Sequence, residues 1–222
     1  MKEFLKATKY IDSDNSKILE YAKNIIAEEE VQVKQVQLLF NHIRDEFSYY
    51  PFEMDLRHDE LKASAQIGKP TGYCVTKAML LSACARALNI PARVCFFVVR
   101  NHLGTGKLEE ALETDLIVFH GSSEVYLNEK WIKLVPAFDS RLCKKLGVSV
   151  IEFDGENDAI FQEFQPESGD RVNEKTYMEY VKEYGSFEDF PYDLALSELK
   201  KYYPSAFDES IPPDKRILFK YW

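Results

Sequence analysis

The chain has 222 residues, of which 45% are hydrophobic and 29% charged, and these values fit one globular domain. Its formal net charge of −9, with no basic stripe to offset it, argues against a nucleic-acid partner and against binding to an acidic membrane surface. No stretch approaches the roughly 18 apolar residues of a membrane span, and the first residues contain no apolar signal region. We therefore expect a cytoplasmic protein with four reduced thiols.

The first third of the chain has helical periodicity. Residues 12–15 (DSDN) offer the side-chain acceptors that favour a helix start, and apolar side chains recur behind them at helical spacing. A second helix is predicted from about residue 30 to 47. It should end before Pro51, because the residue that precedes a proline is disfavoured in helical geometry. Residues 52–73 should form a loop with at most a short helix around 59–65.

The middle of the chain changes character. Residues 74–88 (CVTKAMLLSACARAL) are almost wholly apolar, which predicts a helix buried at the centre of the domain. Residues 92–100 (ARVCFFVVR) are rich in β-branched and aromatic side chains and predict a strand. Two more strands are predicted at 116–127 and 130–135, joined by a hairpin-like turn at Asn128-Glu129.

The remainder of the chain is predicted to return to helices near residues 140–146, 173–184 and 192–203. We find no internal repeat, low-complexity tract or interdomain linker. The fold class that follows is α+β, with residues 1–222 forming one domain in which three or four antiparallel strands pack against a central helix.

Cys74 is the strongest candidate for chemistry. It follows Gly72-Tyr73 and opens the buried helix, where backbone N–H groups and the helix dipole favour a negatively charged thiolate. The glycines and proline just before it let the chain approach closely, so that backbone donors could face an oxyanion beside the sulfur. The alternative is an inert core thiol. We assign that role to Cys84 and Cys95, and we expect Cys143 to lie in a surface helix or in the core.

A thiolate needs a base, and the chain contains four histidines. His42 lies on a polar helix face, His58 in a charged loop, and His102 in the turn after a strand. His120 differs, because it lies within an apolar strand, where an imidazole must either be hydrogen-bonded or take part in chemistry. Its two interpretations are a structural histidine and the base of Cys74, and the presence of a candidate nucleophile favours the second.

Two acidic residues could support the imidazole. Asp139 follows the last predicted strand of the hairpin, and it could either orient His120 or cap the helix that starts at Ser140. Glu124 lies four residues after His120 on the same face of the strand. It could be a supporting partner near the site or a solvated charge at the edge of the sheet.

Several segments, in this order, resemble the transglutaminase-like superfamily, a branch of the papain-like cysteine enzymes, in its bacterial and archaeal form. The first is Gly72-Tyr73-Cys74 with the helix behind it and its exit at residues 86–94 (RALNIPARV). The second is the strand at 120–127 (HGSSEVYL), and the third is residues 131–136 (WIKLVP). The helices before them are also similar to the family's lead-in. The resemblance covers about residues 15–140.

This resemblance implies a papain/transglutaminase-like core, in which the central helix carries the nucleophile Cys74 against a small antiparallel sheet that carries His120. Extra N- and C-terminal helices would complete it, and Gly72 and Tyr73 would border the substrate. Val135 stands where the family's acidic triad member would fall, which leaves Asp139 as the candidate acid. Residues 141–222 lie outside the resemblance and form an extension whose role is open.

We expect thiol-dependent acyl transfer, in which Cys74 attacks an amide or ester carbonyl and His120 protonates the leaving group and then activates water. Hydrolysis of an amide or peptide bond is favoured over transamidation, because the chain has neither a secretion signal nor an acidic calcium-loop pattern. The alternative is a binding module that kept this fold and lost catalysis, and Val135 supports it.

The expected partner is a peptide or small amide substrate, and the sequence leaves the oligomeric state open. A metal site built on Cys74 and His120 would need further ligands, and none is found at suitable spacing. We therefore expect no metal and no other cofactor.

Overall fold

The computed structural model describes residues 1–102, 107–160, 178–210 and 219–220. Two helices, α1 (Ser16–Ile26) and α2 (Gln32–Glu46), open the domain after a single 3-10 turn, η1 (Lys2–Leu5). The side chain of Asn15 caps α1 by accepting from the backbone N–H of Lys17, as residues 12–15 predicted. Each helix buries the apolar face that its periodicity indicated and leaves a polar face to solvent.

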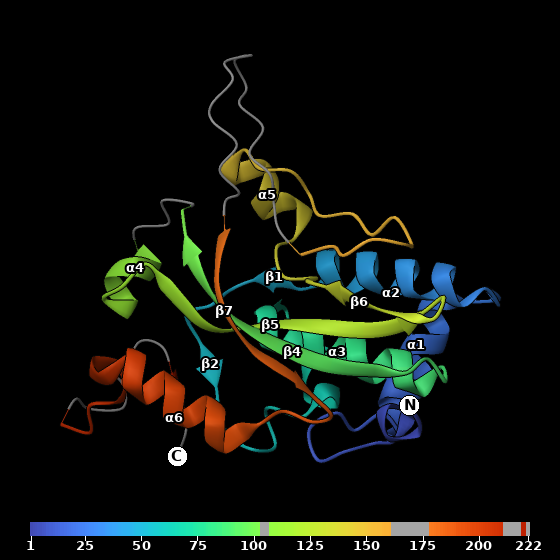
Figure 1. Ribbon diagram of the computed structural model, residues 1–222, viewed down its shortest axis with the longest axis horizontal. Coiled ribbons are helices and arrows are strands. Elements are labelled where there is room, and N and C mark those ends of the chain that lie inside the picture. Colours follow the sequence, from blue (N-terminus) through green and yellow to red (C-terminus); the bar gives the residue numbers. More distant parts are fainter. Residues whose placement is uncertain (103–106, 161–177, 211–218, 221–222) are drawn as a thin grey trace.

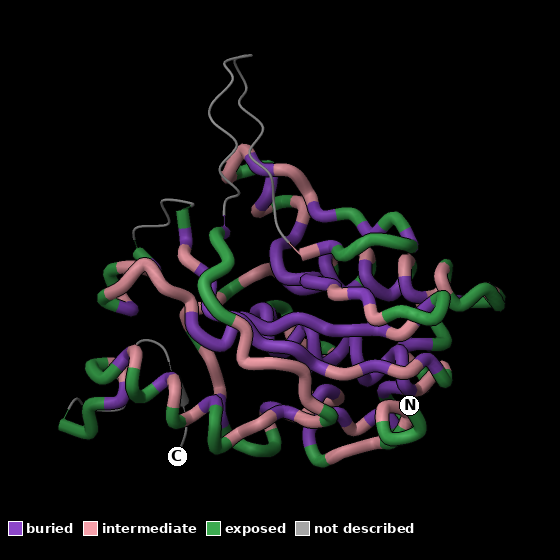
Figure 2. The backbone as a smooth tube through the Cα atoms, in the orientation of Figure 1, coloured by how far each residue is buried: buried purple, intermediate pink, exposed green. Residues whose placement is uncertain are grey.

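Helix α3 (Cys74–Ala87) is the centre of the domain. Every residue from Cys74 to Arg86 is buried, so the helix has no solvent face, as its unbroken apolar sequence predicted. Helices α1 and α2 pack against one side of α3 and the main sheet packs against the other (Figure 1). Figure 2 shows this central layer as the most continuously buried part of the chain.

The main sheet has four antiparallel strands in the order β6-β5-β4-β7. They are β4 (Ala92–Asn101), β5 (Leu116–Leu127), β6 (Lys130–Leu134) and β7 (Met178–Phe187). Asn128 and Glu129, which join β5 to β6, both have positive φ, the geometry of a tight hairpin turn. The sheet confirms the predicted α+β class and the central helix with its small antiparallel sheet.

Two short parallel pairs hold the segment between α2 and α3. Strand β1 (Ser48–Tyr49) pairs with β3 (Thr71–Gly72), and β2 (Met54–Asp55) pairs with β8 (Phe219–Lys220). The 3-10 helix η2 (Ala63–Gln66) lies at the end of the stretch where a short helix was predicted. Because β3 leads directly into α3, the β1–β3 pair fixes the position of Gly72, two residues before the candidate nucleophile, and pairs it with Tyr49.

The later part of the chain holds α4 (Lys107–Leu112), α5 (Ser140–Leu146), α6 (Tyr192–Tyr202) and η3 (Pro204–Phe207). The helices predicted near 140–146 and 192–203 are confirmed. The helix predicted at 173–184 is wrong over residues 178–184, which belong to β7, while residues 173–177 lie outside the described ranges. Pairing with the open edge of β4 decides this segment, since a long-range ladder can override a local helical preference.

None of the helices in the described part of the chain is long and apolar enough to cross a membrane.

Candidate active site

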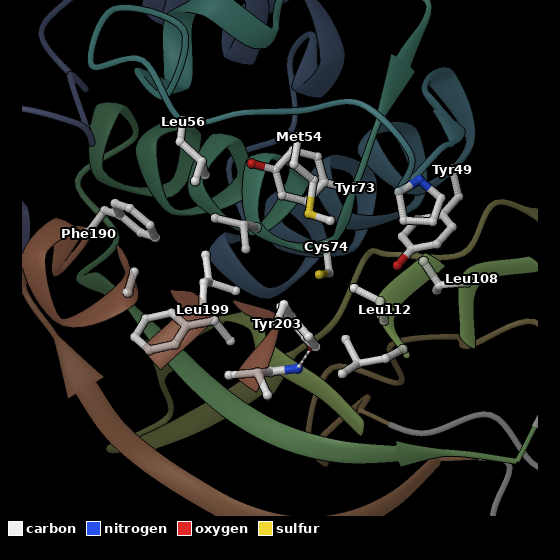
Figure 3. A pocket seen from close by; sticks show the side chains of 16 residues that line it. Tyr49, Met54, Leu56, Tyr73, Cys74, Leu108, Leu112, Phe190, Leu199 and Tyr203 are labelled. Atoms are coloured by element: carbon white, nitrogen blue, oxygen red, sulfur yellow. Dashed lines mark hydrogen bonds between the residues drawn. The ribbon is translucent and has the colours of Figure 1, made fainter. Parts of the chain in front are cut away.

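Cys74 is the first residue of α3 and lies directly after Gly72 and Tyr73. The backbone N–H of Tyr73 donates to Thr76 Oγ1 at 3.2 Å, which closes the first turn of the helix. Cys74 itself is only 6% exposed. Its thiol points into an apolar cavity (Figure 3).

Burial raises the pKa of the Cys74 thiol above its ordinary value. Donor groups beside the sulfur oppose that effect, among them the backbone N–H groups of Gly121 and Val75 and the hydroxyl of Tyr49. The resting group is therefore a neutral thiol that already faces the donors a thiolate would need.

Gly121 allows strand β5 to pass directly over the start of α3. A Cβ atom at this position would lie 2.8 Å from Val75 Cα, closer than such atoms can approach, and 3.1 Å from Val75 N, which is a tight contact. The absence of a side chain therefore brings the Gly121 N–H to the sulfur. The sequence did not single out this glycine.

Tyr49 is the second residue that the sequence did not single out. Its backbone N–H donates to Asp139 Oδ2 at 2.9 Å, and its ring contacts that of Phe138 with centroids 4.7 Å apart. These contacts hold the β1 strand so that the phenol reaches the thiol of Cys74. A tyrosine just before a proline turn gave no sequence signal for this role.

Asp139 caps helix α5, accepting from the backbone N–H groups of Arg141 and Leu142. Burial raises the pKa of this carboxyl, but the hydrogen bonds from Tyr49 and Leu142 and the nearby Arg141 outweigh it and lower the pKa overall. Within the described residues, no hydrogen bond joins Asp139 to His120. The structure thus gives Asp139 the capping role and links it to Tyr49 instead.

His120 lies in β5 immediately before Gly121, so its backbone is adjacent to the thiol. The side chains of a strand alternate, and Ser123 faces α3 through a 2.7 Å contact with Ser82, which places the His120 side chain on the opposite face of β5. The residue is 2% exposed, and burial lowers the pKa of the imidazole to about 4. Its Nδ1 has no hydrogen-bond partner, and no hydrogen bond connects the ring to the thiol in the described part of the chain.

Glu124 shares that face of β5 and is 3% exposed. It forms an ion pair with Arg93 and lies 3.7 Å from Lys133 Nζ. It is therefore a buried partner of two cations on the sheet, and the interpretation as a solvated edge charge was wrong. Val135, at the position of the family's acid, is buried, and its backbone N–H donates to the carbonyl of Ala159 at 2.8 Å.

Gly72 and Tyr73 border the nucleophile as expected. The carbonyl of Gly72 accepts from the backbone N–H of Tyr50 at 2.9 Å, which extends the β1–β3 pairing up to the site. Tyr73 is 6% exposed, and its hydroxyl has no hydrogen-bond partner. That hydroxyl is a polar atom in the otherwise apolar wall beside Cys74.

The cavity in front of Cys74 is small and apolar, with a free volume of about 40 Å³. Its walls come from the start of α3, from β5, from the segment around Met54, and from α4 and α6 (Figure 3). Phe190, Leu199 and Tyr203 belong to the extension beyond residue 140, so this extension closes one side of the site. The Tyr203 hydroxyl also accepts a hydrogen bond from the backbone N–H of Val118 at 2.6 Å.

All four cysteines are buried thiols, and the core placement predicted for Cys84 and Cys95 is confirmed. Cys143 lies in the core as well. Among the described residues, no three or more histidine, cysteine, aspartate or glutamate side chains come together in a group that could hold a metal ion.

The model of the family described as the transglutaminase-like superfamily matches residues 19–136, more than half of the chain. The solved structure of a candidate cysteine protease from Cytophaga hutchinsonii matches with a TM-score of 0.47 at 25% identity, over 63% of this chain and 41% of that one. A candidate protease from Parabacteroides distasonis matches with a TM-score of 0.36 at 14% identity, over 60% of this chain and 24% of that one. This chain therefore spans less than half the length of either structure. Among the curated proteins, none matches.

Proposed function

We infer the function from the premise that this chain belongs to the transglutaminase-like superfamily. We propose that it is a thiol-dependent acyl-transfer enzyme with Cys74 as its nucleophile, and that it hydrolyses an amide, peptide or ester bond. His120 is the proposed base and proton donor.

The proposed reaction has two steps. Cys74 Sγ forms a bond to the carbonyl carbon, the bond from that carbon to the leaving nitrogen or oxygen breaks, and His120 moves the thiol proton to the leaving group. Water then attacks the thioester and gives a proton back to the sulfur through His120, which releases the acid. The Gly121 and Val75 N–H groups and the Tyr49 hydroxyl would stabilise the negative charge that develops beside the sulfur.

The observation that supports this proposal most is the convergence of those three donors on one thiol that faces a cavity. Inert core thiols need no such arrangement, and Cys84, which lies further along the same helix, has only burial and a distant carboxylate acting on its pKa. His120 is uncharged at pH 7, because burial lowers its pKa to about 4, and the same burial makes it a weak base in the resting structure. In the structure the ring lies on the face of β5 that points away from α3, so this role requires the strand around His120 to rearrange and turn the ring toward the sulfur.

Labelling with iodoacetamide near neutral pH tests the nucleophile, with the other three thiols as internal controls. We expect Cys74 to react first, and we expect its alkylation to abolish hydrolysis of an activated ester such as p-nitrophenyl butyrate. Uniformly slow labelling of all four thiols would contradict the proposal.

A binding module that lost catalysis is the second candidate, favoured by the missing hydrogen bond between His120 and the thiol and by the buried Val135. Under this alternative, Cys74→Ala keeps its ligand affinity, and the wild-type protein shows no turnover above the uncatalysed rate. Comparing the two proteins in one ester-hydrolysis assay separates the candidates.

We also propose a cytoplasmic location, because the free thiols of Cys74, Cys84 and Cys95 fit a reducing compartment. Recovery of the native protein in an oxidising compartment would contradict this part of the proposal.

A further inference from the structure

Two neighbouring hollows lie at the site, both lined mainly by apolar side chains, and Cys74 lines the first of them. The cavity that the thiol faces has a free volume of about 40 Å³, which is room for roughly three water-sized groups. A second hollow of about 130 Å³ shares Tyr49, Pro51, Leu108 and Ile117 with it. The second hollow approaches the size of an engineered cavity that holds a benzene molecule.

The lining limits the charge of an occupant. No charged side chain is among the described residues that line either hollow. A charged substrate group would lose its hydration in either part and gain no ionic partner in exchange. The second hollow has aromatic walls, with Tyr50, Phe52 and Phe138 beside the shared Tyr49, and such walls suit a flat or branched apolar group.

One polar atom in this lining lacks a partner. Tyr73 is 6% exposed and follows the β3 strand into α3, and its hydroxyl has no hydrogen-bond partner among the described residues. Figure 3 draws its ring in the same wall as Met54, with the hydroxyl on the side of Leu56. A buried hydroxyl is normally hydrogen-bonded, so the Tyr73 hydroxyl has a free hydrogen bond to offer to a molecule bound in the cavity.

We propose that Cys74 acts on uncharged, apolar acyl groups. A short aliphatic part would occupy the cavity at the sulfur, and an aromatic or branched part would occupy the second hollow. The Tyr73 hydroxyl would hydrogen-bond a carbonyl or amide group of the same molecule. This assignment of substrate class rests on the proposed function, because it takes Cys74 as the nucleophile.

Three haloacetyl probes with one reactive group test the proposal: iodoacetanilide (aromatic and uncharged), iodoacetamide (small and uncharged) and iodoacetate (anionic). The rate constant at Cys74 is measured by peptide mapping and divided by that of glutathione with the same probe. We expect the normalised rate for iodoacetanilide to exceed that for iodoacetate at least tenfold. Equal normalised rates would overturn the substrate class and leave the nucleophile in place, whereas no labelling by any probe would overturn the proposed function as well.

Tyr73→Phe isolates the hydroxyl. This variant should fold at least as stably as the wild type, because it removes a buried polar atom without a partner. Its normalised rate with iodoacetanilide, whose amide can bond the hydroxyl, should fall roughly three- to tenfold, the effect of one lost hydrogen bond. Tyr126→Phe, which removes a hydroxyl in β5 away from both hollows, is the matched control and should leave the rate unchanged. An unchanged rate in Tyr73→Phe would overturn the role of this hydroxyl.

Discussion

The start of α3 and the middle of β5 hold the two halves of the proposed catalytic pair, and their surroundings differ. At the start of α3, two backbone N–H groups and the Tyr49 hydroxyl converge on the Cys74 sulfur. In β5, His120 is equally buried, but its Nδ1 has no partner and burial alone shifts its pKa. The nucleophile is thus held by several groups at once, while the base lacks the acid that would orient it.

This contrast has a structural cause. A helix start supplies N–H donors by its geometry, and Gly121 adds one more by close approach. Orienting an imidazole instead requires a specific side chain from another strand, and the expected position holds the buried Val135. The carboxylate that the sequence suggested, that of Asp139, is engaged by α5 and by the backbone of Tyr49. Among the described residues, His120 therefore has no acid to orient it, whereas the Cys74 thiol has several donors beside it.

The largest expected effect is the loss of activity when Cys74 is replaced. Cys74→Ser should lower kcat for ester hydrolysis roughly 10³-fold or more, because an alcohol at this position is a far weaker nucleophile. Cys84→Ala, which alters another buried thiol of the same helix, should keep most of the activity. Turnover of p-nitrophenyl butyrate by the two purified variants measures this, and equal activity in both would show that Cys74 is not the nucleophile.

The next prediction concerns the imidazole and pH. Folding lowers the pKa of His120 from 6.5 to about 4, so between these values the unfolded chain binds a proton that the folded protein does not. The wild type should therefore lose stability as pH falls from 6.5 to 4, by about 3 kcal/mol from this residue at roughly 1.4 kcal/mol per pH unit.

Urea unfolding at several pH values measures this loss of stability. His120→Gln should unfold with a shallower pH dependence over this range than the wild type. His42→Gln, which alters a histidine whose side chain is 47% exposed, is the matched control and should keep the wild-type slope. If His120→Gln also keeps that slope, His120 is protonated in the folded protein and has a partner there.

Gly121→Ala tests the close approach of β5 to α3. The new methyl group would meet the backbone of Val75 at 2.8 Å, so one of the two elements must move, at a cost of about 1–3 kcal/mol in the free energy of unfolding. Alkylation of Cys74 should slow as well, because the N–H group moves away from the sulfur. Ser122→Ala, one residue along the strand, removes an unpartnered hydroxyl and should be nearly neutral in the same unfolding assay.

The smallest effect is expected for the phenol at the thiol. Tyr49→Phe keeps the ring contact with Phe138 but removes the hydroxyl that lowers the pKa of Cys74. The pKa of the thiol should rise, and alkylation by iodoacetamide at pH 7 should slow roughly three- to tenfold. Tyr50→Phe changes the more exposed neighbouring tyrosine and serves as control. A faster reaction in Tyr49→Phe would mean that the phenol shields the thiol.

Most of the fold could be predicted, because its elements have strong local signals. The apolar run at 74–88, the β-branched run at 92–100 and the turn at Asn128-Glu129 each became the expected element. The segment 178–184 did not, because its strand exists only through pairing with β4. The same distinction applies to the site. Cys74 has a local signature in its helix start, whereas Tyr49 and Tyr203 reach the site through contacts between segments far apart in the chain.

The sequence by itself determined that a cysteine would open a buried central helix beside a strand carrying a histidine, because periodicity and chain-breaking residues act over a few positions. Only the tertiary structure decided what touches those two side chains. It brought Gly121 and Tyr49 to the sulfur, committed Asp139 to a helix cap, and left His120 without a hydrogen-bond partner at Nδ1. Whether such contacts form depends on differences of less than one ångström in the spacing of packed elements. No residue pattern along the chain encodes that spacing locally.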